Sequence, residues 1–248
     1  MTIKTFIVDS FTNEPFKGNP AGVCLLEQEI DVHMMQSIAS EINLSETAFL
    51  IQNAADDTKF SIRFFTPTVE IAFCGHATLA SAKIVLQYLG KNSVEFTTHH
   101  SLKIEATSEG ENIKMLFPLY DTVPANPSQQ FLDAFAINKP VASRFAKELN
   151  MLLVEVENKG TLLNINPDFV KANDCAEGVK VFIVTSKSED NEYDFYSRCF
   201  CPWIGINEDP VTGAAHTVLA KYWGDIFGKT EMMAWQSSKR GGFMKLNI

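Results

Sequence analysis

Three side chains in this sequence are candidates for moving protons: Glu46, His76 and Asp209. Glu46 lies in the segment NLSETAF, whose apolar flanks favour partial burial. Burial raises the pKa of a carboxyl group toward the range that suits general acid/base catalysis. The ordinary alternatives are a solvated surface carboxylate and a helix-capping residue, since most glutamates are exposed. Glu46 is therefore a candidate proton carrier, and its burial decides between these readings.

His76 and Asp209 each stand near the start of a predicted helix. The helix N-terminus is expected to lower the pKa of His76 and keep its ring neutral, a form that both donates and accepts a proton. The alternative is a histidine that is hydrogen-bonded for structural reasons alone. Asp209, in the segment EDPVTG, either caps the helix or accepts a hydrogen bond from a substrate amine or hydroxyl. We expect its neighbour Glu208 to be solvated.

The remaining polar motifs predict neither a metal nor a cofactor. The five cysteines are odd in number and unevenly spaced, which argues against a disulfide framework. Cys199 and Cys201 share one face of a predicted strand, but no cysteine or histidine cluster has zinc-like spacing. Nucleotide-binding, serine-hydrolase and zinc-protease motifs are missing from the sequence. His99 and His100 are expected to be solvated, and Asn19 either forms a turn or lines a cleft.

Two segments of the chain resemble each other. RFFTP at 63–67 matches RCFCP at 198–202, and each is followed by a small-residue helix start, CGHATLA or TGAAHTVLA. Chance similarity is the alternative to an internal duplication, which the shared order and spacing favour. Duplicated halves generally pack about a pseudo-two-fold axis, so we expect the helix starts at Gly75 and Gly213 to face one cleft. Two helix N-termini there would stabilise a carboxylate or an enolate-like oxygen.

The elements that must position these residues follow from hydrophobic periodicity and turn signals. Helices are predicted over 32–42, over 75–90 with Gly90 as its end, and over 213–224 with Gly224 as its end. A proline-rich linker spans 118–130, so we predict two domains, 1–117 and 118–248. The predicted strands are 3–11, 21–26, 46–52, 59–65, 94–98, 102–107, 112–117, 151–157, 161–165, 179–186, 193–200, 232–236 and 242–248.

The overall composition excludes several partners. The chain has 248 residues and a formal net charge of −9, which disfavours nucleic acid because an acidic surface repels phosphates. No apolar run reaches the roughly 18 residues that a membrane span needs. The N-terminal segment turns polar too soon for a signal-peptide core. We therefore expect a cytoplasmic protein that acts on a small molecule.

Five segments together resemble the PhzF-like (phenazine-biosynthesis-like) family. They are DSFTNEPFKGNPAGV, NLSETAFL, RFFTPTVEIAFCGHATLA, GINEDPVTGAAHTVLAKYW and QSSKRGG, which run in family order from residue 9 to 242. The resemblance implies an α+β diaminopimelate-epimerase-like fold of two pseudo-symmetric halves, each a curved sheet around a central helix. It also implies a site between the halves, catalysis without metal or organic cofactor, and a homodimer.

The resemblance implies a role for each matched residue. Glu46 matches the family's acid/base residue, and His76 and Asp209 match residues that orient the substrate or relay protons. The expected substrate contacts are Ser45, Asn19, Gly75, Gly213 and Ala214. Relatives often carry serine at the position of Ala214, so one substrate hydrogen bond is expected to be lost. The chain also stops soon after QSSKRGG, where relatives continue through further strands that would complete the second sheet. Three interpretations stay open: a truncated chain, a compact variant, or a weakened fold with an exposed sheet edge.

The predicted reaction is the relocation of a proton on a small carboxylate-bearing metabolite. Glu46 removes a proton from a carbon that an adjacent carboxylate or conjugated system acidifies, and it returns the proton to another carbon. One alternative is a two-base racemase or epimerase, in which Cys74 and Thr212 occupy the two pre-glycine positions. Threonine is too weakly acidic to replace a thiol there. The other alternative is a non-catalytic small-molecule binding protein, and the substrate itself stays open.

Overall fold

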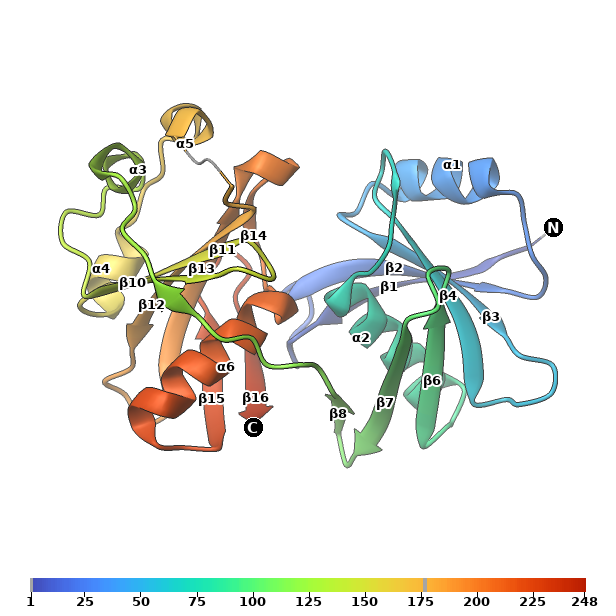
Figure 1. Ribbon diagram of the computed structural model, residues 1–248. Helices are drawn as coiled ribbons and strands as arrows, with labels where there is room; N and C mark the ends of the chain where they lie inside the picture. The colour runs from blue at the N-terminus through green and yellow to red at the C-terminus, as the bar shows by residue number, and fades with distance from the viewer. Residues whose placement is uncertain (1, 176–177) are drawn as a thin grey trace. The chain divides into compact units, whose positions relative to one another are not determined.

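The computed structural model describes residues 2–175 and 178–248, and the chain divides into two compact units, Met1–Phe117 and Pro118–Ile248. Each unit contains one mixed sheet of eight strands (Figure 1). Neighbouring strands are mostly antiparallel, with two parallel pairs in each sheet. The architecture is therefore α+β, as the sequence predicts.

The first unit builds its sheet in the order β1-β2-β3-β4-β6-β7-β8, with β5 paired to β4. Helix α1 (Val32–Ile42) precedes β3, and α2 (Gly75–Lys83) continues into the π-helical turn η1 (Ile84–Tyr88). The strands are β1 (Lys4–Ser10), β2 (Asn19–Leu26), β3 (Thr47–Gln52), β4 (Lys59–Phe65), β5 (Glu70–Ile71), β6 (Ser93–Thr98), β7 (Lys103–Glu109) and β8 (Asn112–Met115).

The second unit has the order β16-β15-β13-β12-β11-β10-β9, with β14 paired to β13. Its helices are α3 (Gln129–Ala134), α4 (Lys159–Leu163), α5 (Phe169–Cys175), the 3-10 turn η2 (Pro202–Ile204) and α6 (Gly213–Phe227). Its strands are β9 (Val123–Pro124), β10 (Ala142–Ala146), β11 (Met151–Glu155), β12 (Val181–Lys187), β13 (Phe195–Cys201), β14 (Ile206–Asp209), β15 (Glu231–Gln236) and β16 (Gly242–Asn247).

A largely buried helix forms the centre of the first unit. Ala77, Ala80 and Ala82 of α2 are fully buried and pack in one core with strand residues such as Val23 and Phe64. Small side chains let the strands approach the helix closely, which keeps the core dense. Because α2 is enclosed in this way, its first turn, with Gly75 and His76, is held by the sheet around it.

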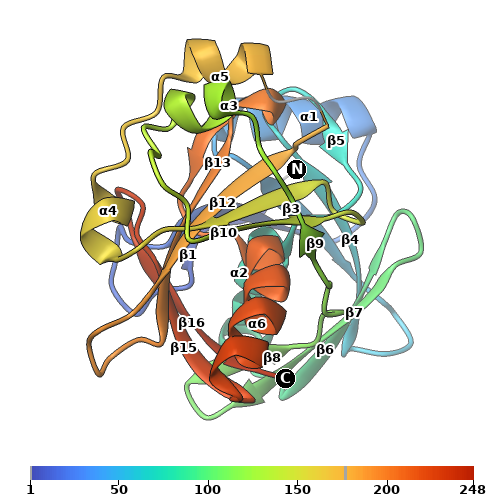
Figure 2. The same ribbon diagram turned by 60° about the vertical axis from the view of Figure 1, so that its left-hand side comes forward.

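The two units repeat one plan. In both, a central strand carries a short strand on the side, and the main buried helix follows the short strand. The pair β4 and β5 is labelled in Figure 2, and the pair β13 and β14 in Figure 1. In each unit, an arginine on the central strand donates two hydrogen bonds to a glutamate on the short strand. The pairs are Arg63 with Glu70 (2.8 and 2.7 Å) and Arg198 with Glu208 (2.7 and 3.0 Å). This shared ion pair supports the internal duplication inferred from the sequence.

Three sequence predictions are wrong. Residues 161–165 were predicted as a strand but lie in and just after α4, because Asn158 caps that helix by accepting a hydrogen bond from the Thr161 N–H at 2.9 Å. Helix α6 continues past Gly224 and ends at Gly228, which adopts the left-handed conformation. Glu208 is paired with Arg198 rather than solvated.

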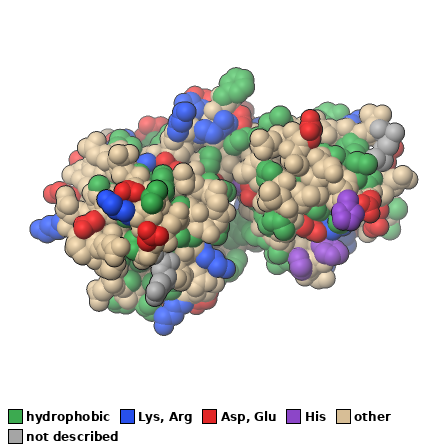
Figure 3. All heavy atoms as spheres, turned by 90° about the horizontal axis from the view of Figure 1, so that it is seen from above, with side chains coloured by type: hydrophobic (Ala, Val, Ile, Leu, Met, Phe, Trp, Pro, Cys, Tyr) green, Lys and Arg blue, Asp and Glu red, His purple; other side chains and the backbone are tan. Residues whose placement is uncertain are grey.

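The short elements β5, β9, β10, β14, α3 and α5 were also not predicted, because their runs are too brief for a periodicity signal. The exposed His99 and His100 follow β6, as predicted, and histidine side chains are visible on the surface in Figure 3. Among the described residues, no helix combines the length and apolarity that a membrane crossing requires.

Candidate functional site

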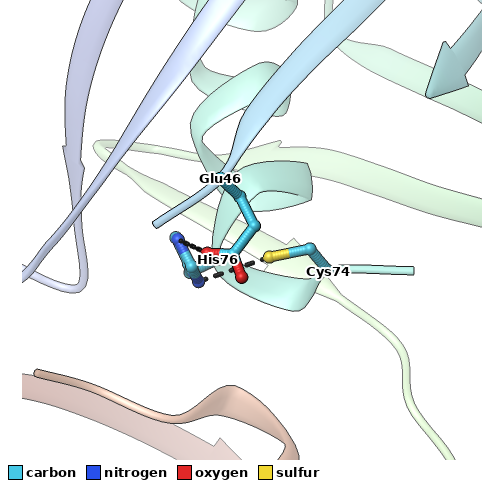
Figure 4. Close-up of side chains that lie close together, drawn as sticks. All are labelled: Glu46, Cys74 and His76. Atoms are coloured by element: carbon cyan, nitrogen blue, oxygen red, sulfur yellow. Dashed lines mark hydrogen bonds and ion pairs between the residues drawn. The ribbon is translucent and has the colours of Figure 1, made fainter. Parts of the chain in front are cut away.

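Glu46, Cys74 and His76 form a buried cluster at the start of α2 (Figure 4). The Glu46 Oε2 atom lies 3.1 Å from His76 Nε2, and Cys74 Sγ lies 3.4 Å from His76 Nδ1. The two ring nitrogens of His76 therefore face two different partners. Relative exposure is 9% for Glu46, 8% for His76 and 7% for Cys74, so the cluster is nearly dry.

The backbone on both sides of Glu46 fixes its position. Glu46 immediately precedes β3, and its carbonyl oxygen accepts a hydrogen bond from the Gly22 N–H of β2 at 3.0 Å. A Cβ atom at Gly22 would lie 2.8 Å from the Thr47 Oγ1 atom. Only glycine lets β2 pass so close to the residue that follows Glu46. Gly22 thus helps to place the carboxylate without touching it.

His76 is held from two directions. Ser10 of β1 donates a hydrogen bond from its hydroxyl to the His76 carbonyl oxygen at 2.9 Å. Ser45 places its Oγ atom 3.5 Å from His76 Nε2, beside Glu46. Cys74 is the residue that precedes α2, and its side chain makes no hydrogen bond to the helix N–H groups. The first turn of α2 therefore keeps backbone N–H donors that its own side chains do not use.

The pKa values of Glu46 and His76 shift in the directions opposite to those expected from the sequence. Burial alone would raise the pKa of Glu46, but hydrogen bonds and charge from His76, with Ser45 and Cys74, hold this pKa below its ordinary value. Burial alone would lower the pKa of His76, but interactions with Cys74 and Glu46 raise it well above the ordinary value. The expectations of a raised carboxyl pKa and a neutral ring were wrong, because each group supplies the other's counter-charge.

One carboxylate oxygen of Glu46 is available for further chemistry. Oε2 is buried, and no described residue gives it an aligned hydrogen bond, although His76 lies within ion-pair distance. A buried acceptor without such a bond is costly in free energy and unusual in proteins. Uptake of a ligand or a proton is one of the roles that account for such an atom, beside strain and a bound water.

The second unit places Asp209 in a different arrangement. Asp209 ends β14, and its Oδ2 atom accepts a hydrogen bond from the Thr212 hydroxyl at 2.5 Å. Thr212 directly precedes α6, so Asp209 does not itself cap that helix. The fully buried Gln236 of β15 donates to the Asp209 carbonyl at 2.8 Å and accepts from the Thr212 N–H at 2.9 Å. Gln236 therefore braces the loop that carries Asp209.

His216 also lies in the first turns of α6, where the sequence gave no functional signal. Its ring is 2% exposed, and Nδ1 lies 2.8 Å from the Thr212 carbonyl oxygen. Burial lowers the pKa of His216 to about 4, so the ring is neutral at pH 7. The equivalent residue of α2, Thr78, makes the same contact, since its hydroxyl donates to the Cys74 carbonyl at 2.7 Å. We interpret His216 as structural.

The structure brings together some of the predicted site residues within each unit. Ser45, Glu46 and His76 meet at the first turn of α2, which begins at Gly75. A Cβ atom at Gly75 would lie 4.0 Å from Phe73 Cζ, an ordinary van der Waals contact, so a small side chain would fit at this position. Cys74 is an addition to the predicted catalytic set, and its place before the helix glycine was the only sequence signal for it.

Other predicted contacts remain predictions. Asn19 begins β2 opposite Ser10 and is fully buried. In the second unit, Gly213 and Ala214 begin α6 directly after Thr212. Substrate contact by Asn19, Asp209, Gly213 and Ala214 stays a prediction.

The comparisons with known proteins agree with this architecture. The family profile described as phenazine biosynthesis-like protein (PhzC-PhzF) matches residues 8–248. An uncharacterized isomerase of Halalkalibacterium halodurans is 41% identical over 252 residues, which cover 100% of this chain and 92% of that protein. A phenazine biosynthesis PhzC/PhzF protein from Clostridium difficile matches with a TM-score of 0.90 at 34% identity, covering 99% of this chain and 91% of that one.

A more distant structure extends the likeness of fold. A probable proline racemase from Agrobacterium radiobacter gives a TM-score of 0.55 at 10% identity, over 98% of this chain and 84% of that one. The fold is thus diaminopimelate-epimerase-like, as predicted, and the protein is an enzyme of the PhzF-like isomerase class. The chain belongs to the phenazine biosynthesis-like (PhzC-PhzF) family.

Proposed function

We propose that this enzyme relocates a proton on a small carboxylate-bearing metabolite without a cofactor, and that Glu46 carries the proton. The observation that supports the proposal most directly is the Glu46 carboxylate. It is 9% exposed, paired with His76 at 3.1 Å, and keeps an oxygen without an aligned hydrogen bond. A desolvated and oriented carboxylate is positioned to act as a general base, and its lowered pKa means that the chemistry depends on this position more than on base strength.

The charge pair sets the direction of the first step. Glu46 starts as the carboxylate, because His76 holds its pKa low. It takes a proton from a substrate C–H bond, and the bonding electron pair moves into the adjacent conjugated or carboxylate system. The nearby positive charge of His76 and the N–H groups that begin α2 stabilise the anion that forms.

The second step completes an isomerisation. The Glu46 carboxyl group returns its proton to a different carbon of the same intermediate, which restores the carboxylate. Substrate and product then have the same composition, and no oxidant, reductant or co-substrate is consumed. Asp209 is proposed to accept a hydrogen bond from a substrate amine or hydroxyl. We also propose that the enzyme is a homodimer and that it acts in the cytoplasm.

A second candidate is a two-base racemase that uses Cys74. One observation favours it, since the Cys74 thiol lies 3.4 Å from His76 Nδ1 inside the same cluster. Against it, the residue before α6 is Thr212, whose hydroxyl is too weak an acid to serve as the second base. We therefore rank proton relocation by Glu46 first.

The test is isotope exchange in heavy water with a panel of small cyclic acids and amino acids, followed by mass spectrometry. We expect deuterium to enter at least one compound with the natural chain, and Glu46→Gln to abolish this. Glu41→Gln, a change at an exposed glutamate of α1, is the matched control and should leave exchange intact. Loss of exchange in Cys74→Ala with retention in Glu46→Gln would establish the racemase instead. No exchange across the panel would favour a binding protein.

A further inference from the structure

The buried cluster carries the three kinds of donor atom that zinc prefers. Cys74 offers a sulfur, His76 a ring nitrogen and Glu46 a carboxylate oxygen, and one such atom from each lies within 4.8 Å of the other two. Cysteine, histidine and glutamate are all established ligands of Zn²⁺. The sequence gave no sign of this set, because the third ligand, Glu46, lies just before β3 and is distant from Cys74 and His76 in the chain. Figure 4 shows the three side chains converging.

The sulfur and nitrogen already have the spacing of a tetrahedral site. Zinc–sulfur and zinc–nitrogen bonds of about 2.3 and 2.0–2.1 Å place the two ligand atoms about 3.6 Å apart. Cys74 Sγ and His76 Nδ1 lie 3.4 Å apart. Glu46 must bring one oxygen toward these two atoms, away from its contact with His76 Nε2 at 3.1 Å. Its Oε2 atom has no aligned hydrogen bond to give up.

Charge and access also suit a divalent cation. A thiolate and a carboxylate together balance two positive charges, which offsets the repulsion between a cation and a helix N-terminus. The side chains of His76 and Glu46 remain 10% and 12% exposed, so the cluster is not sealed from solvent. Three protein ligands leave the fourth tetrahedral position for water, as in zinc sites that are open to small molecules.

We propose that Glu46, Cys74 and His76 bind one Zn²⁺ ion and that this ion switches off the proton-transfer site. On binding, the Cys74 thiol and His76 Nδ1 each release a proton to solvent, and their lone pairs form the bonds to zinc. The oxygen of Glu46 that would accept the substrate proton is then occupied. The inhibitory part rests on the proposed function, whereas the binding part does not.

The internal duplication supplies a comparison within the same chain. At the start of α6, Thr212 and Ala214 occupy the positions that Cys74 and His76 hold at α2. A threonine hydroxyl and an alanine methyl do not provide thiolate and imidazole ligands. The fold repeats, but the donor set does not, so one metal ion per chain is expected.

Binding is measured directly, on chelator-treated full-length protein carrying Cys175→Ser to remove a partly exposed thiol on α5. Equilibrium dialysis with Zn²⁺ should give one ion per chain. Co²⁺ in its place should give a thiolate-to-cobalt charge-transfer band. Cys74→Ser should weaken Zn²⁺ binding at least tenfold and remove the band. Cys24→Ser, at another buried thiol of the same unit, should change neither. Circular dichroism establishes that each variant is folded.

Two results would overturn the site: no Zn²⁺ retained by the folded protein, or binding that Cys74→Ser leaves unchanged. The regulatory part is tested by exchange assays with Zn²⁺ and with excess chelator. Zn²⁺ should suppress exchange in the Cys175→Ser protein, and the chelator should restore it. Stoichiometric Zn²⁺ with undiminished exchange would overturn the switch. Exchange that is missing even with chelator would instead contradict the proposed function, while dialysis still decides the metal site.

Discussion

Gln236 on β15 accepts a hydrogen bond from the backbone N–H of Thr212, the residue that precedes α6, at 2.9 Å. Its amide nitrogen donates to the Asp209 carbonyl at 2.8 Å and to the Thr212 hydroxyl at 3.2 Å. One fully buried side chain thus supplies hydrogen-bond partners for three polar groups of the loop between β14 and α6. The loop that carries Asp209 therefore depends on a strand that comes later in the chain.

The first prediction is that Gln236→Leu destabilises the protein by about 3 kcal/mol. The substitution removes the hydrogen-bond partner of two partly buried groups, the Thr212 N–H and the Asp209 carbonyl, and each such loss costs about 1–3 kcal/mol. Urea unfolding measures the change. Gln52→Leu removes an exposed glutamine that donates to the Asp57 carbonyl, and it should cost less than about 0.5 kcal/mol. Equal losses of unfolding free energy in the two variants would contradict the proposal that Gln236 stabilises the loop that carries Asp209.

The second prediction concerns the glycine beside Glu46. Gly22→Ala places a Cβ atom 2.8 Å from Thr47 Oγ1, so β2 and β3 must shift. We expect a loss of about 1–3 kcal/mol, as for other overpacked sites. Thr47→Ala removes the obstructing hydroxyl, which is buried and has no described hydrogen-bond partner. In a double-mutant cycle, Gly22→Ala should therefore cost at least 1 kcal/mol less in the Thr47→Ala background. Additive costs would argue against this steric account.

The third prediction is a loss of stability in acid that is caused by His216. Its pKa is about 4 in the folded chain against 6.5 ordinarily, so the unfolded chain binds more protons between these values. The free energy of unfolding should therefore fall as pH drops from about 6.5 to about 4, by about 3 kcal/mol for this group. Above pH 7 the group should have no effect.

His216→Thr tests this, because threonine repeats the hydrogen bond that Thr78 makes in α2. The difference in unfolding free energy between the natural chain and the variant should be constant above pH 7. It should shift in favour of the variant by about 3 kcal/mol toward pH 4. A difference that stays constant across the whole range would assign the acid sensitivity to other groups.

The fourth prediction uses the duplicated arginines as a matched pair. Arg198 holds Glu208 and also donates to the carbonyl groups of Leu162 and Ile165, at 3.2 and 2.8 Å. Its side chain is 11% exposed, whereas that of Arg63 is 24% exposed. Arg198→Met should cost about 3 kcal/mol, and Arg63→Met about 1 kcal/mol because solvent screens that pair. Urea unfolding measures both losses. Similar losses of unfolding free energy in the two variants would show that the hydrogen bonds from Arg198 to the two carbonyl groups do not contribute to stability.

The sequence by itself determined the family, the fold class and most long elements. Alternating apolar residues predict β4, and a continuous apolar run predicts β12. The small residues after Gly75 predict a helix enclosed by a sheet. These signals are local, because periodicity and turn residues act over a few positions. The duplicated motifs can also be recognised in the sequence alone, and the structure contains equivalent Arg–Glu pairs in the two units.

Only the tertiary structure decided the chemistry of the site. The burial of Glu46 was a sequence-based inference, but the direction of its pKa was not, because that depends on the distance to His76. The candidate ligand set combines Glu46, just before a strand, with Cys74 and His76 at a helix start. The continuation of α6 past Gly224 also depends on tertiary packing. Electrostatic energy varies with separation in space and with local dielectric, and neither quantity is fixed by spacing along the chain.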